Sequence, residues 1–262
     1  MGDFRKYGKA PFRVLVIHGG PGGPGSIAQL AQSLSHRFGV IEPFQTEDSI
    51  RGQIKELDAC INEQSEIPVI LVGHSWGAWL GCIYAAEFPA KLKKLIMIGS
   101  GPFGEEYVSR IAETRNSRFT PAEREEISKL EKFMKLSTVL GHEMIMKRYT
   151  ELMYRADSYD PLPRIESDIM FQPDIYRRVW GEASALRSSG KLLEKAARVS
   201  CPVVIIHGYD DPHPAEGVTR PLKGIVKNMK FVGLKKCGHE PWNEKHARER
   251  FLKLLDKELN VL

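Results

Sequence analysis

Residues 69–77 of this 262-residue chain read VILVGHSWG, and much of the fold can be inferred from this stretch. Four apolar residues lead into Gly73, and the pattern of residues 76–87 is typical of a helix. Ser75 therefore lies on a predicted tight turn between a strand and a helix. Glycines two residues on either side suit such a turn, because its backbone is strained and neighbouring chain approaches closely. We predict that Ser75 presents its hydroxyl as a nucleophile at the carboxyl end of a strand.

Short β-branched runs alternate with longer helical patterns along the rest of the chain. This alternation is typical of parallel strands joined by crossover helices. We predict an α/β fold with a mostly parallel, doubly wound sheet of about six strands. The candidate strands are 13–18, 40–42, 69–73, 95–99, 203–207 and 230–234, and the candidate helices are 27–36, 50–64, 76–87, 215–227 and 243–259.

The alternation is interrupted once, between residues 101 and 190. This segment has no convincing strand, is rich in Glu and Arg, and carries the helix-start signal Thr120-Pro121-Ala122-Glu123. We interpret 101–190 as a helical lid inserted into a core domain made of 1–100 and 191–262. The aromatic and methionine residues of the lid are expected mainly to pack its helices together, with a few facing a substrate pocket.

Composition restricts the class of protein. Hydrophobic residues make up 42% and charged residues 27%, which is typical of a soluble globular protein. The net charge of +5 is spread among acidic residues, which argues against a nucleic-acid partner. We expect no membrane span and no signal sequence, since no apolar run is long enough. Four widely spaced cysteines in or beside apolar runs are interpreted as reduced thiols, which predicts a cytoplasmic protein.

A serine nucleophile needs a histidine base, and the histidine needs a carboxylate to hold its tautomer. Two loops after later strands supply them: Asp210 and Asp211 follow one strand, and His239 follows the next. Parallel strands bring these loops to the same sheet edge as Ser75. We prefer Asp211 to Asp210 as the acid, because Pro212 fixes the chain beside it and Asp210 is free to pair locally.

The glycine-rich loop of residues 18–25, HGGPGGPG, allows two interpretations. In the first, the amides of Gly20 and Trp76 converge on a developing oxyanion. In the second, Gly20-x-Gly22-x-x-Gly25 binds a dinucleotide, with Glu42 as the ribose-binding carboxylate. Prolines within the loop lack the amide hydrogens that a pyrophosphate needs, and only the first interpretation also explains the serine, aspartate and histidine. A purely structural turn is the third possibility.

With these residues in place, the chain resembles the α/β-hydrolase superfamily and, within it, the proline-iminopeptidase-like group. The resemblance rests on 18–22, on 73–77 and on the loops of Asp211 and His239, in that order. It implies acyl transfer to water through an acyl-enzyme on Ser75, with no cofactor. The chain departs from the group in having His74 before the serine and in having missing or very short leading antiparallel strands.

Peptidases of that group use carboxylates in the lid to recognise a free α-amine. The segment 180–182 looks loosely similar, so Glu182 is the candidate substrate-binding residue. The predicted function is cleavage of a small ester, amide or aminoacyl bond in a small molecule or short peptide.

Three alternatives stay open from the sequence. One is a catalytically silent relative that binds a ligand under the lid, and another is the NAD-binding oxidoreductase that the glycine loop would fit. The third is a metal site built from residues at the predicted acid and base loops. Their spacing matches no established ligand set, so we predict that the protein needs no metal. The candidate ligands are His207, Asp210, Asp211, His213 and His239.

Overall fold

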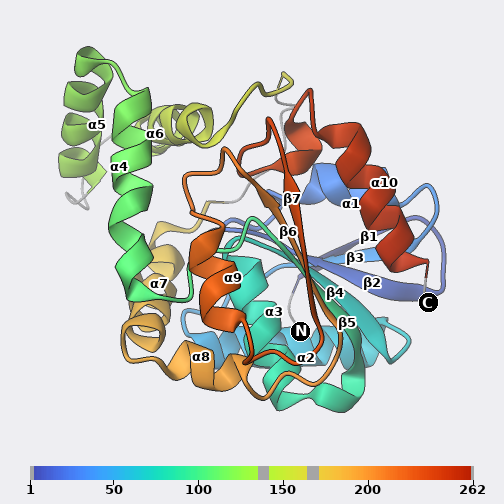
Figure 1. Cartoon of the computed structure of the whole chain (residues 1–262). Helices are drawn as coiled ribbons and strands as arrows, with labels where there is room; N and C mark the ends of the chain where they lie inside the picture. Colours follow the sequence, from blue (N-terminus) through green and yellow to red (C-terminus); the bar gives the residue numbers. More distant parts are fainter. Residues whose placement is uncertain (1–2, 135–141, 164–170, 261–262) are drawn as a thin grey trace.

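The computed structural model describes residues 3–134, 142–163 and 171–260, and a twisted sheet runs through its centre (Figure 1). Seven strands of the described chain form this sheet in the order β1-β3-β2-β4-β5-β6-β7. The six from β2 to β7 pair in parallel, which confirms the predicted sheet. The strands are β1 (Phe4–Tyr7), β2 (Phe12–Ile17), β3 (Gly39–Pro43), β4 (Val69–His74), β5 (Leu92–Ile98), β6 (Val203–Gly208) and β7 (Met229–Leu234).

The leading strand β1 was expected to be missing or very short, and it is four residues long. It pairs antiparallel with β3, from Phe4 opposite Pro43 to Tyr7 opposite Val40. Its residues are charged or aromatic and mostly half-buried, so no apolar run marks it in the sequence. The pairing with β3 depends on residues far along the chain.

Alternate strand residues point to opposite faces of the sheet, and each face is covered by helices. Val14 and Val16 pack in one apolar cluster with α1 (Ala28–Leu34) and α10 (Arg248–Leu259). Leu15 and Ile17 pack in the other. That cluster includes α2 (Ile50–Gln64), α3 (Trp76–Glu87), α8 (Lys191–Ala196) and α9 (Glu216–Leu222). The helices α2 and α3 begin and end where the sequence predicted.

Three helices are shorter in the structure than predicted, and the first of them, predicted for 27–36, is α1 (Ala28–Leu34). The last helix was predicted from residue 243 but begins at Arg248. Residues 241–243 form a separate 3₁₀ turn, and the backbone of Glu244 is extended, with φ −101° and ψ 122°, so the helix cannot run through this part of the chain. The helix predicted for 215–227 ends at Leu222, one residue after Pro221.

A helical segment lies between β5 and β6, within the predicted lid; residues 135–141 and 164–170 of that prediction lie outside the described residues. Thr120 and Glu123 bond each other reciprocally at the start of α5, forming the predicted cap. Figure 1 shows α4, α5 and α6 standing off one end of the sheet. The division into core and lid stays a prediction. The helices are α4 (Val108–Arg118), α5 (Pro121–Met134), α6 (His142–Asp157) and α7 (Pro173–Ser188).

All four cysteines are free and buried, as the sequence analysis expected. Burial raises the pKa of each thiol, so these side chains act as small apolar groups. No helix in the described part of the chain has both the length and the apolar character needed to cross a membrane.

Candidate active site

Ser75 lies on a sharp turn between β4 and α3, with φ 54° and ψ −113°. A positive φ is strained for any residue with a β-carbon, so the surrounding packing must hold this turn in place. A side chain at Gly73 would collide with the Gly77 carbonyl, and one at Gly77 would collide with the Ile17 carbonyl. Both glycines of the motif are therefore required by close backbone approach, as predicted.

Asp211 and His239 meet at the carboxyl ends of β6 and β7. The Nδ1 atom of His239 lies 2.7 Å from Oδ2 of Asp211, whose side chain is fully buried. Burial alone would raise the pKa of Asp211, but its electrostatic and hydrogen-bond interactions with His239 and His213 hold it well below its usual range. Burial would lower the pKa of His239, but the Asp211 charge and hydrogen bond raise it. The pair is therefore a carboxylate holding an imidazole through its Nδ1–H.

Ser75 and His239 both contact the end of β5, at neighbouring residues. The Ser75 amide donates to the Ile98 carbonyl at 2.9 Å. A β-carbon at the next residue, Gly99, would lie 2.8 Å from the His239 carbonyl and 3.4 Å from Asp211 Oδ2. No hydrogen bond joins the Ser75 hydroxyl to the His239 imidazole among the described residues. Such bonds are often long in ligand-free enzymes and tighten when substrate binds.

The two neighbouring aspartates have different partners. Asp211 bonds His239, whereas the Asp210 carboxylate accepts the Cys237 amide at 3.2 Å. Asp210 thus ties the loop after β6 to the loop after β7. Of the two candidate acids, Asp211 is the one that contacts the candidate base.

His213 is a second imidazole on the same carboxylate, which sequence reasoning considered only as a metal ligand. Its Nδ1 lies 2.8 Å from Asp211 Oδ1, its backbone amide donates to the same oxygen at 2.9 Å, and its ring stacks on His239 at 4.5 Å. Burial lowers the pKa of His213, so its ring is a neutral donor. His207 donates from Nε2 to the His213 carbonyl at 2.7 Å and so fixes this loop.

His74, directly before Ser75, contacts the loop of the candidate base. Its Nε2 donates to the His239 carbonyl at 3.1 Å, and its ring packs between His239 and the edge of Trp242. Burial and the nearby His239 hold the pKa of His74 well below its usual value, so it stays neutral. The residue before the candidate nucleophile therefore anchors the backbone of the candidate base.

Glu244 holds the His239 loop from the other side. Only 1% of Glu244 is exposed, and its carboxylate accepts the amides of Gly238, Tyr159 and Asp160 at 2.8 to 2.9 Å. The His239 amide also donates to the Asp157 carbonyl at 2.8 Å. The end of α6 is thereby bonded to the loop that carries the candidate base.

The glycine-rich loop packs directly on the Ser75 turn. A β-carbon at Gly19 would lie 3.2 Å from Cβ of Ser75, and Gly20 has a φ of +46°. His18 is fully buried and bonds the Gly19 carbonyl at 3.0 Å, and burial lowers its pKa to about 4. The amides of Gly20 and Trp76, the latter in the first turn of α3, have no acceptor among the described residues. Two free amides therefore flank Ser75 in the chain segments that contact it.

The environment of Glu42 does not suit a ribose-binding carboxylate. Glu42 lies within β3, is fully buried, and accepts the Tyr7 hydroxyl at 2.7 Å. Burial raises its pKa. The carboxylate is closed off from solvent by the fold, so the dinucleotide interpretation of the glycine loop has no open carboxylate at this position.

The structure shows Glu182 in contact with α2, and its role in binding substrate stays a prediction. Glu182 accepts the Ile50 amide at 2.9 Å and so caps the start of α2. It lines a groove of about 880 Å³ among α2, α3, α7 and α8, which includes none of Ser75, Asp211 and His239. The sequence similarity of 180–182 was too short to fix where this helix packs.

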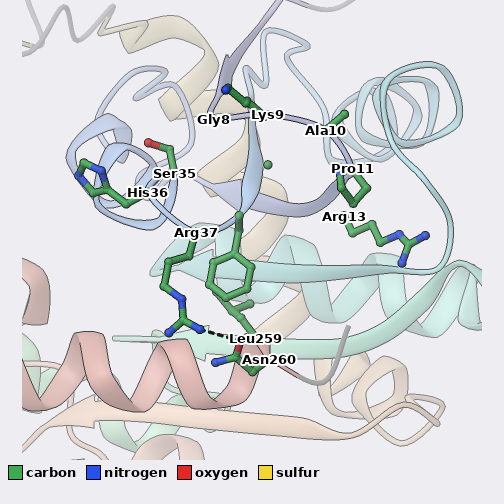
Figure 2. Close-up of a pocket in the computed structure, with 12 residues that line it drawn as sticks. Gly8, Lys9, Ala10, Pro11, Arg13, Ser35, His36, Arg37, Leu259 and Asn260 are labelled. Carbon is green, nitrogen blue, oxygen red and sulfur yellow. Dashed lines mark hydrogen bonds between the residues drawn. The ribbon is translucent and has the colours of Figure 1, made fainter.

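A second cavity, of about 670 Å³, lies at the edge of the sheet where the parallel strands begin, opposite the edge that carries Ser75 (Figure 2). It is lined by 8–11, by 35–39 and by the end of α10, next to where β2 and β3 begin. Ser75, in contrast, follows the carboxyl end of β4. Neither cavity contains the candidate nucleophile.

The helical segment contributes aromatic rings and one ion pair near the site. Arg115 bonds Asp157 through two 2.6 Å contacts, and its charge acts on the pKa of both His239 and Tyr176. The Gln172 amide donates to the Gly22 carbonyl at 2.8 Å, which fixes the start of α7 on the glycine loop. An aromatic row of Phe171, Tyr176, Trp180 and Trp79 then runs from the start of α7 to α3.

Residues 65–244, more than half of the chain, match the protein family described as alpha/beta hydrolase fold. The chain therefore belongs to the α/β-hydrolase family. The match includes the Ser75 turn and the loops of Asp211 and His239.

Individual relatives are distant. A cis-3-alkyl-4-alkyloxetan-2-one decarboxylase of Shewanella oneidensis is 26% identical over 104 residues, which is 34% of this chain and 33% of that enzyme. The matched region therefore spans about a third of the curated relative. An alpha/beta fold family hydrolase of Bacillus anthracis strain Sterne has TM-score 0.72 at 16% identity, covering 98% of this chain and 94% of that one. A monoacylglycerol lipase of Paleococcus ferrophilus has TM-score 0.60 at 20% identity, covering 99% and 98%. These two structures share the fold.

Proposed function

We propose that this protein is a serine hydrolase that cleaves a small ester, amide or aminoacyl bond through an acyl-enzyme on Ser75. The observation that carries the proposal is the 2.7 Å contact between Asp211 and Nδ1 of His239, at the sheet edge where the strained Ser75 turn lies. A carboxylate on Nδ1 leaves the Nε2 lone pair available, which is the tautomer a general base needs.

The reaction would begin when His239 Nε2 takes the Ser75 proton as Oγ attacks the substrate carbonyl. The Asp211 charge stabilises the imidazolium that forms. The amides of Gly20 and Trp76 would donate to the oxyanion, each contributing about 3 to 4 kcal/mol to transition-state stabilisation. His239 then gives its proton to the leaving group, and a water activated by His239 releases the acyl group from Ser75. The chemistry requires no cofactor.

An ester or other acyl substrate fits the surroundings better than a peptide with a free α-amine. Recognition of an amine calls for an unpaired carboxylate beside the site. Asp157 is engaged by Arg115, and Glu182 is engaged by the start of α2. Aromatic rings at the start of α7 favour an apolar acyl or alcohol group.

We also propose a cytoplasmic location. Four free cysteines, all buried, fit a reducing compartment in which thiols persist.

The test is hydrolysis of p-nitrophenyl acetate and butyrate beside proline and alanine p-nitroanilides. The wild-type protein is expected to turn over the esters and to leave the anilides largely uncleaved. Ser75→Ala should abolish ester turnover, whereas Ser188→Ala, at the exposed end of α7, should leave it unchanged. Equal ester turnover by wild type and Ser75→Ala would refute the proposal.

One observation favours a catalytically silent ligand-binding protein as the second candidate: the Ser75 hydroxyl has no hydrogen bond to His239 among the described residues. Burst kinetics separate the two functions. A hydrolase releases about one equivalent of p-nitrophenol per active site in a rapid first phase, and a silent binder shows no such phase.

A further inference from the structure

Asp211, His213 and His239 bring three metal-ligating groups together at one point. Among the described residues these three form the group whose donor atoms all lie within 4.8 Å of one another. The two imidazole Nδ1 atoms face different oxygens of one carboxylate, at 2.8 and 2.7 Å. Two imidazoles and one carboxylate are a set that binds Zn²⁺ in proteins.

We propose that this cluster is an inhibitory site for Zn²⁺ or a similar late transition metal ion, coordinated by His213, His239 and Asp211. Tetrahedral zinc with bonds of about 2.1 Å to nitrogen separates its ligand atoms by about 3.4 Å. The donors that lie up to 4.8 Å apart would need to approach by about 1.4 Å, whereas the nitrogen–oxygen pairs at 2.8 and 2.7 Å would need to separate by about 0.6 Å. Rotation of the two stacked rings would make both changes. A fourth position stays open for water.

The remaining candidate ligands lie outside this group of three, and each has a hydrogen bond of its own. His207 Nε2 lies 3.5 Å from Asp211 but donates to the His213 carbonyl at 2.7 Å. The Asp210 carboxylate accepts the Cys237 amide. The side chains of His213 and His239 are each 12% exposed, whereas Asp211 is fully buried, so an ion would enter from the side of the two imidazoles.

Metal binding would switch off the proposed function through the tautomer of His239. The proton on each neutral imidazole now lies on Nδ1, where it is shared with Asp211. Coordination through Nδ1 moves that proton to Nε2 of the same ring, and two neutral rings therefore release no net proton. With Nε2 protonated, His239 has no lone pair with which to accept the Ser75 proton. The inhibitory effect rests on the proposed function, whereas the binding itself does not.

Direct binding is measured by calorimetric titration of ZnCl₂ into metal-free protein. We expect one ion per chain and at least about tenfold weaker binding by His213→Asn. Replacing a residue that only bonds a metal's ligands already changes the affinity about 10- to 100-fold. His246→Asn is the matched control. His246 is also a histidine beside a carboxylate, Asp160, but only in an exposed pair, so this variant should bind zinc as the wild type does.

A second measurement needs no variant. Nitrogen NMR of the histidine rings should show zinc shifting the Nδ1 resonances of two rings and moving their protons to Nε2. Zinc should also slow labelling of Ser75 by a fluorophosphonate in wild type, with recovery on adding EDTA, and should slow it much less in His213→Asn. Equal zinc affinity of wild type and His213→Asn, or NMR shifts at Nε2 alone, would overturn the site. If the protein binds zinc but the fluorophosphonate does not label Ser75 even in metal-free protein, the zinc site stands and the proposed serine-hydrolase function fails.

Discussion

The loops at the carboxyl ends of β4 to β7 and the helices α4 to α6 are held in different ways. The loops are tied by buried polar groups: Glu244 is 1% exposed and accepts three amides, and His74 bonds the His239 carbonyl. The helices are tied to one another by a small apolar cluster and by ion pairs, of which Arg148 with Glu126 is exposed and Arg115 with Asp157 is partly buried. α4 itself has no buried residue.

This difference separates the parts that need fixed geometry from the part that does not. Proton transfer requires its groups within hydrogen-bond reach, so the loops that hold them gain from buried, fully bonded contacts. A surface helical segment with few buried contacts opens at low free-energy cost and tolerates sequence change. The comparison predicts that substitutions in the loops change activity or stability strongly and that substitutions in the helices change them little.

The largest effect is expected from Asp211→Asn. The amide cannot hold His239 in the basic tautomer, so kcat should fall about 10⁴-fold, or about 5.5 kcal/mol. Asp210→Asn is the matched control, because its amide oxygen still accepts the Cys237 amide, and it should retain kcat within about tenfold. Steady-state ester kinetics measure both. A larger loss in Asp210→Asn would show that the acid has been assigned to the wrong aspartate.

Glu244→Ala should have the next largest effect, on stability. Three amides lose their acceptor, and each unsatisfied amide costs about 1 to 3 kcal/mol, so unfolding should become easier by about 3 kcal/mol or more. Urea denaturation followed by circular dichroism gives the value. A loss below about 1 kcal/mol would mean that the loop is not held by this carboxylate.

The pH dependence of kcat/KM tests the electrostatics of the same loops. The Asp211 charge raises the pKa of His239 above its ordinary value of 6.5, and the base must be unprotonated to act. Activity should therefore be lost as the pH falls through a midpoint above 6.5. A midpoint below 6.5 in a pH-rate profile contradicts the charge pairing.

The smallest effect is expected in the helices. Arg148 and Glu126 are 47% and 37% exposed, and exposed ion pairs contribute about 0 to 1 kcal/mol. Arg148→Ala should change the free energy of unfolding by less than about 1 kcal/mol and leave kcat unchanged. A loss comparable to that of Glu244→Ala, measured in the same urea titration, would erase the contrast between the two regions.

Local sequence patterns were enough to predict most of the fold and to choose the candidate site residues. The apolar run before Gly73 and the glycine spacing around Ser75 are short-range signals. They predicted the bounds of α3 and placed β4 and the turn, with β4 ending one residue later than predicted. Asp211 and His239 were selected because parallel strands bring their loops to one edge, and the two side chains are in fact bonded. Assignment of their catalytic roles stays a prediction.

The features that were not predicted depend on contacts between residues far apart in the chain. The strand β1 exists through its pairing with β3. The chain before α10 is extended at Glu244, whose carboxylate bonds amides more than 80 residues away. Glu182 faces the start of α2, a contact across 132 residues. The second imidazole on Asp211 and the anchoring role of His74 could be suspected from histidines inside both motifs, but their partners follow only from the fold.

The central claim is that Ser75 is made nucleophilic by the His239 and Asp211 pair. Reaction with a fluorophosphonate, followed by mass spectrometry of the digested protein, tests it most directly. We predict one adduct per chain on the peptide that contains Ser75, and strongly slowed labelling in His239→Gln. Unmodified Ser75 in folded wild-type protein, or labelling that is as fast in His239→Gln, would contradict the claim.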